Sequence, residues 1–284
     1  MWYDKFMRRG ILSIIIVFIS VGISLAEVIN PRVVQQGKCF SVSLTSPEAA
    51  TSVTVSFLGQ RVNCYQGDDS FSAIVGVAPE QRPGDHPLIL IVTKGDGSRE
   101  EIKRTIKVGK IRFPFVSFWL KPSKKKLFTK DLIAEEWARI EKVLVVEPAQ
   151  KAWSGRFNLP AKGPVSMVFG TVERVNGKPS GRHRGLDLAV PMGTRIKAPN
   201  HGRVVFAEHL KAFGGTIVLD HGQGIHTLYF HLSKFLAKAG QDVSKGDIIA
   251  LSGNSGISSG PHLHWGMSAH NLRVDPVQWT KYAF

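Results

Sequence analysis

The chain has 284 residues, of which 43% are hydrophobic and 21% are charged. This is the composition of an ordinary globular protein rather than a disordered chain, and the length suffices for about two domains. The formal net charge of +15 and the pI near 10.0 indicate an anionic counterpart, either nucleic acid or an envelope polymer or lipid surface.

The first 26 residues resemble a secretory signal peptide. Basic residues precede an apolar run over 11–26, which ends with the small residues Ser24 and Ala26 where a signal peptidase would read them. We therefore predict a signal peptide at 1–26, cleaved after Ala26. The run has 16 residues, which is short for a bilayer span, and an uncleaved membrane anchor is the alternative. In both cases we expect an exported protein of the periplasm or cell envelope.

Residues 27–110 are predicted to form a β-sandwich module of the immunoglobulin-like type. Runs with alternating or β-branched residues recur at 40–44, 52–58, 71–77, 88–93 and 101–108. Turn signals separate these runs, and "KGDGS" at 94–98 predicts a hairpin between the last two. Short strands at this spacing are typical of a small sandwich. No cluster of ionisable residues suggests chemistry here, so we expect the module to serve as a spacer, an inhibitor or a binding unit.

The cysteines Cys39 and Cys64 both lie in this module. An exported protein meets an oxidising compartment, which favours a disulfide between them. Two buried thiols are the alternative.

Residues 111–154 are predicted to be a linker that contains an amphipathic helix. The basic run at 121–126 is interpreted as solvated. Thr129 can cap a helix that extends to about Val146, before Pro148. Its apolar stripe is Ile133, Trp137, Ile140 and Leu144, and the opposite face carries Glu135, Glu136 and Lys142. We expect the stripe to dock on a domain.

Residues 155–284 are predicted to be a glycine-rich, mostly antiparallel β domain. Its strand-like runs are "VSMVFG", "GRVVFAE", "GTIVLDHG", "IHTLYFHL" and "DIIALSG", and the one helical feature expected is a short turn near 234–239. Residues 151–284 carry 16 Lys or Arg against 7 Asp or Glu, and nine of the ten histidines. The basic charge and the possible chemistry are therefore concentrated in this domain.

Several of these histidines follow a pattern that suits a metal. Along a strand, alternate side chains share a face, so His262 and His264 point to one side, as do His183 and Asp187. His231 stands between apolar neighbours, which indicates that its ring faces something particular. Two neutral imidazoles and a carboxylate suit zinc with a fourth position left open for water or substrate. These five candidate groups for three ligand positions leave two histidines over, which could act as acid, base or oxyanion donor.

Three segments in this order resemble the lysostaphin-type, or LytM-like, zinc metalloendopeptidases, a family of peptidoglycan hydrolases. They are "HRGLD" at 183–187, "LYFHLS" at 228–233 and "GNSGISSGPHLHWG" at 253–266. The resemblance covers about residues 155–280 and implies a domain of the duplicated hybrid motif type. It implies that Zn²⁺ is held by His183, Asp187 and His264, with His231 and His262 as the catalytic pair.

The resemblance also implies a substrate of peptidoglycan peptides with flexible crosslinks. Two residues depart from the family pattern: Phe230 stands where a small residue is usual, and Trp265 where phenylalanine is frequent. Both are expected to narrow the substrate-binding groove, and the approach loop at 172–182 is expected to line this groove.

Other readings of the motifs are weaker. "GISSG" at 256–260 fits a serine-hydrolase motif, but that motif requires a strand turning into a helix, and Pro261 follows here. We therefore expect Ser258 and Ser259 to shape the turn before His262. The remaining histidines of the domain are expected in turns or on the surface: His201, His209, His221, His226 and His270.

The sequence thus predicts a zinc endopeptidase that cleaves crosslinks or stem peptides of peptidoglycan. The alternative is a non-catalytic envelope protein that activates or regulates other wall hydrolases, which the presence of all five groups disfavours. A nucleic-acid binder is disfavoured because no platform of interleaved aromatic and basic residues accompanies the charge. A regulatory partner in the envelope is compatible with this interpretation, and the oligomeric state is left open.

Overall fold

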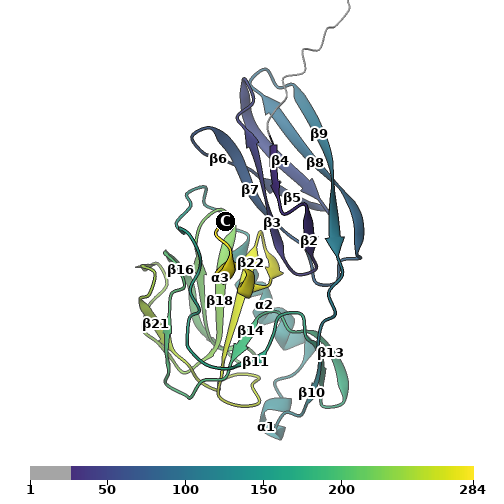
Figure 1. The fold of residues 1–284 in the computed structure, drawn as a ribbon. Coiled ribbons are helices and arrows are strands. Elements are labelled where there is room, and N and C mark those ends of the chain that lie inside the picture. Colours follow the sequence, from purple (N-terminus) through teal and green to yellow (C-terminus); the bar gives the residue numbers. More distant parts are fainter. Residues whose placement is uncertain (1–26) are drawn as a thin grey trace, which may run out of the picture.

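The computed structural model describes residues 27–284, and the signal-peptide prediction lies outside these residues. Figure 1 shows N-terminal strands in purple and blue at one end and a C-terminal β domain in green and yellow at the other, with helices α1 and α2 connecting them in sequence. The chain is mostly β, with N-terminal sheets, a short helical linker and a C-terminal β domain, as predicted. No helix in 27–284 has the length and apolarity needed to cross a membrane.

The N-terminal part is built from two sheets whose inner faces share one hydrophobic core. The first sheet has the order β1 (Glu27–Asn30), β3 (Cys39–Thr45), β7 (Ser70–Gly76) and β6 (Tyr65–Gln66). The second has the order β2 (Val33–Gln35), β9 (Arg99–Gly109), β8 (Gly84–Lys94), β4 (Ala50–Phe57) and β5 (Gln60–Asn63). Alternation creates this core: Leu88, Leu90 and Val92 are buried, whereas the residues between them are only half-buried.

All five predicted strands of this part are present, and the 94–98 segment forms the turn of the β8–β9 hairpin. The short strands β1, β2, β5 and β6 were not predicted, because two to four residues carry too little periodicity to be recognised.

The predicted disulfide was wrong. Both thiols are free in the described part of the chain, which contains both cysteines. Cys64 packs in the core between the two N-terminal sheets, whereas Cys39 packs against Trp153, at the end of the linker, and Trp279 of the C-terminal domain. The two side chains therefore lie in different cores, and burial raises the pKa of each thiol to about 12.

The linker contacts the C-terminal domain along much of its length. Strand β10 (Phe115–Phe118) pairs in parallel with β12 (Val172–Val175) of that domain. Helix α1 (Pro122–Lys125) occupies the basic run that was interpreted as solvated, and Lys124 Nζ donates hydrogen bonds to the carbonyls of Asn254 and Gly256 at 3.0 and 2.6 Å. Lys124 therefore anchors the linker, contrary to the sequence-based interpretation, whereas Lys121, Lys125 and Lys126 are exposed, as that interpretation expected.

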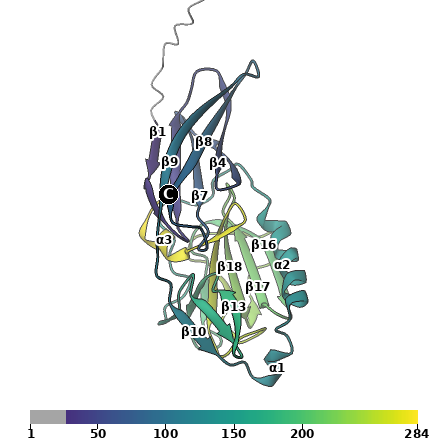
Figure 2. The same cartoon turned by 90° about the vertical axis from the view of Figure 1, so that its right-hand side faces the viewer.

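Helix α2 (Lys130–Leu144) confirms the predicted amphipathic helix. The Thr129 hydroxyl caps it by accepting a hydrogen bond from the N–H of Leu132 at 3.4 Å. Ile140 and Leu144 are fully buried against the C-terminal sheet, and Figure 2 shows the helix alongside β16. Glu136 was expected on the polar face but is buried, because its carboxylate accepts hydrogen bonds from the backbone N–H groups of Lys211 and Ala212.

The C-terminal domain is built around a large, mostly antiparallel sheet. Its order is β11 (Val165–Met167), β14 (Leu186–Leu188), β22 (Leu263–Ala269), β18 (Ile225–Leu232), β17 (Gly214–Asp220), β16 (Gly202–Leu210) and β20 (Asp242–Val243), with β23 (Leu272–Val274) also paired to β22. Smaller sheets are β10–β12 (Val172–Val175)–β13 (Lys178–Arg182) and β15 (Arg195–Lys197)–β21 (Ile248–Leu251)–β19 (Lys234–Phe235).

The two faces of the large sheet have different environments. One face packs Tyr229, Leu263 and Trp265 into the domain's main core. The other face presents Leu228 and Phe230 toward α2. Alternation along β22 therefore places His264 on the face beneath α2 and Trp265 on the core face.

Helix α3 (Pro276–Lys281) was not predicted. Asp275 caps it by accepting from the N–H of Val277 at 2.8 Å, and Pro276 occupies the first turn, so a start signal was present in the sequence. The segment predicted as a short helical turn, 234–239, begins instead as strand β19.

Candidate active site

Three of the five predicted site residues converge on one point. Asp187 on β14 and His264 on β22 are directly paired across two antiparallel strands and so share a face. His183 approaches from the segment that joins β13 to β14. The atoms His183 Nε2, Asp187 Oδ1 and His264 Nδ1 lie 2.8–2.9 Å from one another, and all three residues are buried.

The chemistry of this donor set fits a cation. The Nδ1 of His183 faces the Val168 carbonyl at 3.1 Å, so in the neutral ring Nδ1 carries the proton and Nε2 presents a lone pair. That lone pair points at a carboxylate oxygen and at a second ring nitrogen. Such a convergence of acceptors is unfavourable unless a positive charge lies among them. His183, Asp187 and His264 therefore form a metal site, with a carbonyl orienting one ligand from behind.

The local electrostatics favour an ionised Asp187. Burial opposes its charge, but the close contacts with His183 and His264 outweigh burial and hold its pKa well below the ordinary range. Burial lowers the pKa of His264 to about 4, although Asp187 opposes that shift. For His183, burial is outweighed by the contact with Asp187, and its pKa is raised.

The absence of a side chain at Gly185 leaves room for this cluster. Gly185 lies two residues before Asp187, and a Cβ built on it would be 2.5 Å from His264 Nε2 and 2.6 Å from the Trp265 carbonyl. Any side chain here would displace His264.

The other two predicted residues, His231 and His262, lie beside the cluster. Their ring centroids are 4.7 Å apart, and His231 is 6.3 Å from His264. His262 Nε2 is 3.7 Å from Asp187 Oδ2. Burial lowers the pKa of His231 to about 3, and the nearby rings of His262 and His264 add to that shift.

Backbone carbonyls orient both flanking rings. His231 Nδ1 is 2.8 Å from the Ser255 carbonyl, and His262 Nδ1 is 2.8 Å from the Gly260 carbonyl. In the neutral rings the proton therefore resides on Nδ1, which leaves Nε2 of each histidine available to accept a proton. The Ser258 hydroxyl donates to the Gly260 carbonyl at 2.7 Å, so Ser258 supports this turn as expected.

A cavity of about 580 Å³ opens beside the five residues. Its lining combines His183, His231 and His264 with side chains from α2, from the β12–β13 hairpin and from the N-terminal part. The main contributors from those elements are Ile133, Trp137, Glu173, Arg182, Ala78 and Glu80. The approach loop at 172–182 thus lines the cavity, as predicted.

The two departures from the family pattern behave differently. Phe230 lines the cavity and stacks on His264, with ring centroids 5.2 Å apart and an interplanar angle of 23°. Trp265 was expected to narrow the groove but is fully buried in the main core, on the opposite face of β22. That expectation was wrong because side chains alternate along β22: the even-numbered residues face the site, and the odd-numbered Trp265 faces the core.

Arg273 is a charged residue of the cavity that no sequence pattern indicated, because it belongs to no recognisable motif. Glu173 also lines the cavity and lies in the segment 172–182 that was expected there. Burial raises the pKa of Glu173, and the negative charge of Asp187 contributes.

One further histidine was wrongly expected in a turn or on the surface: His226 lies within strand β18 and is fully buried. His221 and His270 lie in turns, as expected, but neither is exposed: His221 is fully buried, and the side chain of His270 is 6% exposed and contacts Glu147 at 2.9 Å. His201 and His209 are exposed, as expected.

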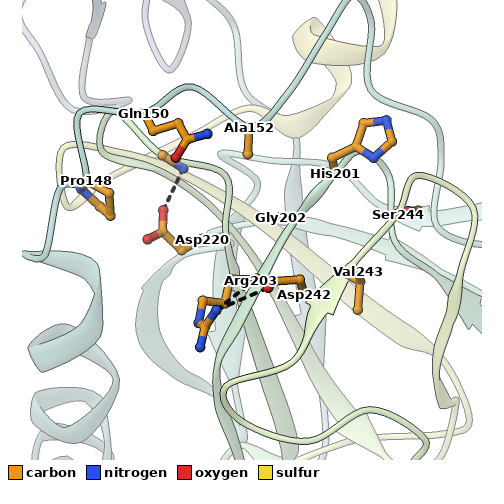
Figure 3. A pocket seen from close by; sticks show the side chains of 11 residues that line it. Pro148, Gln150, Ala152, His201, Gly202, Arg203, Asp220, Asp242, Val243 and Ser244 are labelled. Atoms are coloured by element: carbon orange, nitrogen blue, oxygen red, sulfur yellow. Dashed lines mark hydrogen bonds and ion pairs between the residues drawn. The ribbon is translucent and has the colours of Figure 1, made fainter.

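A second hollow, shown in Figure 3, has no such convergence of ligands. Asp220 accepts a hydrogen bond from the N–H of Gly222 at 2.7 Å, and Arg203 pairs with Asp242 at 3.1 Å. Its charged side chains are therefore already partnered, and it offers no comparable chemistry.

Comparisons with known proteins agree with this geometry. Residues 181–276, which contain all five site residues, match Peptidase family M23. The catalytic domain of lysostaphin from Staphylococcus simulans is 32% identical, and the match covers 92% of that domain and 42% of this chain, with a TM-score of 0.38. The chain belongs to peptidase family M23.

Two further proteins extend the comparison. A crystal structure assigned to peptidase M23 from Pseudomonas aeruginosa is 28% identical, with a TM-score of 0.64, and the match covers 90% of this chain and 96% of that one. Peptidoglycan DD-endopeptidase ShyA from Vibrio cholerae is 46% identical over 34% of this chain and 22% of its own length. The chain spans only about a quarter of the curated relatives it matches first.

Proposed function

We propose that this protein is a zinc-dependent endopeptidase that hydrolyses peptide crosslinks or stem peptides of bacterial peptidoglycan. One observation carries the proposal: three metal-ligating atoms within 2.8–2.9 Å of one another, flanked by two histidines whose Nε2 atoms are available. The relation to ShyA, named as a peptidoglycan DD-endopeptidase, supports the substrate class.

In this proposal His183, Asp187 and His264 hold Zn²⁺. When bound, zinc supplies Lewis acidity, which polarises a peptide carbonyl and lowers the pKa of water. His231 and His262 act on the reacting groups: with Nδ1 tied to a carbonyl, each accepts or returns a proton at Nε2. The 3.7 Å approach of His262 Nε2 to Asp187 Oδ2 keeps that ring directed at the centre. Phe230 and Trp137 form apolar walls that exclude water from the bound peptide.

The finer assignments of fold and location are part of the same proposal. We assign 27–110 to an immunoglobulin-like β-sandwich, 111–154 to the helical linker and 155–284 to a metallopeptidase domain of the duplicated hybrid motif type. The shared core of the two N-terminal sheets supports the first assignment. A peptidoglycan substrate places the action of the protein in the cell envelope, as an exported protein whose residues 1–26 act as the signal peptide.

The alternative, a non-catalytic regulator of other wall hydrolases, is disfavoured by the presence of all five groups in one constellation. Degenerate proteins of this kind are expected to lack at least one ligand, whereas here three ligating atoms converge and both flanking histidines are present.

Two substitutions test the assigned roles. His264→Ala removes one ligand and should abolish stoichiometric zinc binding and cleavage of purified peptidoglycan together. His262→Ala leaves the three ligands in place and should retain zinc while lowering turnover at least a hundredfold, because acid–base groups contribute about 10²–10⁴-fold. Metal content is measured by elemental analysis and cleavage by mass analysis of released fragments.

The exposed His209 provides the matched control, since His209→Ala should change neither quantity. Parental cleavage rates in the His262→Ala variant would refute the role of His262. Zinc retention and activity in His264→Ala would refute the metal site.

A further inference from the structure

Arg273 places a positive charge on the same sheet face as the metal ligands. It lies on β23 opposite Ser268 of β22, and the even positions of β22 carry His264 and Gly266 on this face. Its guanidinium lies over Gly266, where a Cβ would be 1.9 Å from Arg273 Nη2. Two residues of strand span about 7 Å, so the guanidinium is within one or two peptide units of the metal ligands.

This guanidinium is held but not neutralised. Arg273 is 8% exposed, its Nη2 donates a hydrogen bond to the Arg184 carbonyl, and its Cζ lies 5.3 Å from the ring centroid of Trp137. Its Nε is buried with no hydrogen-bond partner, and it forms no ion pair with any residue of 27–284.

Each acidic residue of the cavity either pairs with another residue or is favoured in its neutral form. Glu80 pairs with Arg184 at 2.7 Å, and Glu141 accepts a hydrogen bond from Asn271 at 2.8 Å. For Glu173, burial raises the pKa and so favours the neutral form. Burial and the charge of Arg184 lower the pKa of Arg273 only to about 9, so it remains charged at neutral pH.

A buried cation without a counter-charge is unfavourable, and an anionic ligand removes much of that cost. Guanidinium presents a planar fork of donors that matches a carboxylate, and Trp137 holds the plane from one side. The cavity that Arg273 lines is the one that contains the metal ligands, so a ligand that reaches both is an extended peptide with a free carboxylate.

We propose that Arg273 binds a free carboxylate of the peptide substrate, one or two residues from the scissile bond, and thereby selects carboxylate-bearing over amidated peptides. This inference rests on the proposed function. The carboxylate could be the C-terminal one or that of an acidic side chain, and the recognising chemistry is the same for both.

The test uses three synthetic peptidoglycan-type peptides: one with both carboxylates free, one with the C-terminal carboxylate amidated, and one with the side-chain carboxylate amidated. For the zinc-loaded parent we expect one amidation to lower kcat/KM on the order of tenfold to a hundredfold, mainly through KM, because a charge-assisted hydrogen-bonded pair is lost. The amidation that has this effect identifies the carboxylate.

Arg273→Gln should lower kcat/KM for the free peptide to the level of that amidated peptide, with little further change on the amidated one. Arg273→Lys should restore part of the preference, because it keeps the charge without the fork. Arg203→Gln, an exposed arginine at the separate hollow, is the matched control and should preserve full discrimination.

Equal kcat/KM of the parent on all three peptides would overturn the inference, as would an equal loss on free and amidated peptides in Arg273→Gln. Peptide affinity, measured by calorimetry on the same proteins, separates the two proposals. The parent protein could cleave none of the peptides and still bind the peptide with both carboxylates free more tightly than Arg273→Gln does. In that case the proposed hydrolysis is refuted, whereas the proposed binding of a carboxylate by Arg273 is supported. The comparison of peptides on the parent needs no variant, so a folding defect in Arg273→Gln leaves the test intact.

Discussion

Backbone carbonyls contact three of the four histidines at the candidate site. Val168, Ser255 and Gly260 supply the carbonyls that face Nδ1 of His183, His231 and His262. These carbonyls determine which ring nitrogen faces the centre, so the chemistry of the side chains depends on the backbone of neighbouring loops. Val168 and Ser255 are 15 and 24 residues away from the histidines that they contact, whereas Gly260 is only two residues from His262. Substitution of these loop residues should leave the orientation of the histidine rings unchanged unless it displaces the backbone.

His231 shows how a single backbone conformation directs a side chain. Regular alternation would point His231 away from Phe230 and His264. A register shift between β17 and β18 interrupts the alternation, and His231 adopts φ of 62°, in the left-handed region that is uncommon for non-glycine residues. The resulting bulge brings its ring to within 4.7 Å of His262. Backbone strain of this kind is concentrated at functional sites.

His221, buried away from the site, should make folding stability depend on pH. Its Nδ1 faces the His201 carbonyl at 2.6 Å and its Nε2 the Thr227 hydroxyl at 2.8 Å, while burial lowers its pKa to about 3. The folded state keeps the ring neutral, whereas the unfolded chain protonates it below its ordinary pKa of 6.5. Its contribution to stability is therefore complete above pH 6.5 and is lost as the pH falls toward 3, by about 2 kcal/mol at pH 5.

Urea unfolding at pH 7 and pH 5, with a chelator present throughout, measures this effect. His221→Gln should flatten the pH dependence by about 2 kcal/mol relative to the parent, whereas the exposed His209→Gln should not. A parental pH dependence in His221→Gln would contradict the assignment.

At the scale of elements, α2 is held by a buried carboxylate as well as by its apolar stripe. Glu136 is 4% exposed, and its two carboxylate oxygens accept hydrogen bonds from the backbone N–H groups of Lys211, Ala212 and Phe213 at 2.6, 2.8 and 3.4 Å. The same loop contacts the site, because the Phe213 carbonyl accepts from the N–H of His231 at 3.1 Å. Helix α2 therefore supports the backbone beside His231, one of the two histidines proposed to be catalytic.

Glu136→Ala should lower the free energy of unfolding by about 2–3 kcal/mol, since it leaves buried N–H groups without partners. Glu135→Ala, at the exposed neighbouring position, is the matched control and should remain within about 0.5 kcal/mol of the parent. Urea denaturation of the two variants provides the comparison, and equal stabilities would show that the carboxylate contributes little.

At the scale of the whole molecule, the N-terminal and C-terminal parts are joined by a buried, specific interface. Gln278 of α3 accepts from the Cys39 N–H at 2.7 Å and donates to the Cys39 carbonyl at 2.8 Å. Lys38 pairs with Asp275, and Trp279 and Trp153 pack beneath Cys39 in a common cluster. This combination of apolar packing and paired polar groups predicts that the two parts move together.

Gln278→Ala should loosen this docking, because it leaves the buried Cys39 backbone groups without partners, at a cost of about 2–3 kcal/mol. The fully buried Cys39 thiol should then react faster with a thiol reagent, with the modified residue identified by peptide mass analysis. Gln66→Ala, on the exposed side of β6, should leave the labelling rate of Cys39 unchanged. Unchanged labelling in Gln278→Ala would indicate that the interface does not depend on this pair.

Much of this architecture could be predicted from sequence, because it depends on local periodicity. Alternation indicated the main N-terminal strands, and a cap with a 3–4 spacing of apolar residues indicated α2. The same alternation placed His262 and His264 on one face, and the resemblance to a family of zinc peptidases associated them with His183, Asp187 and His231. These features need only residues close together in the chain or a recognised motif.

Tertiary structure decided the features that depend on residues far apart in sequence. Folding brings together the strands and loops that determine three such features. These are the side to which Cys39 faces, the burial of Glu136 and His221, and the position of the Arg273 guanidinium over Gly266. A local pattern states which residues share a face, but it does not state what will cover that face. The covering element determines whether a charged group meets solvent, a partner or an empty cavity, and that is decided only when the elements pack.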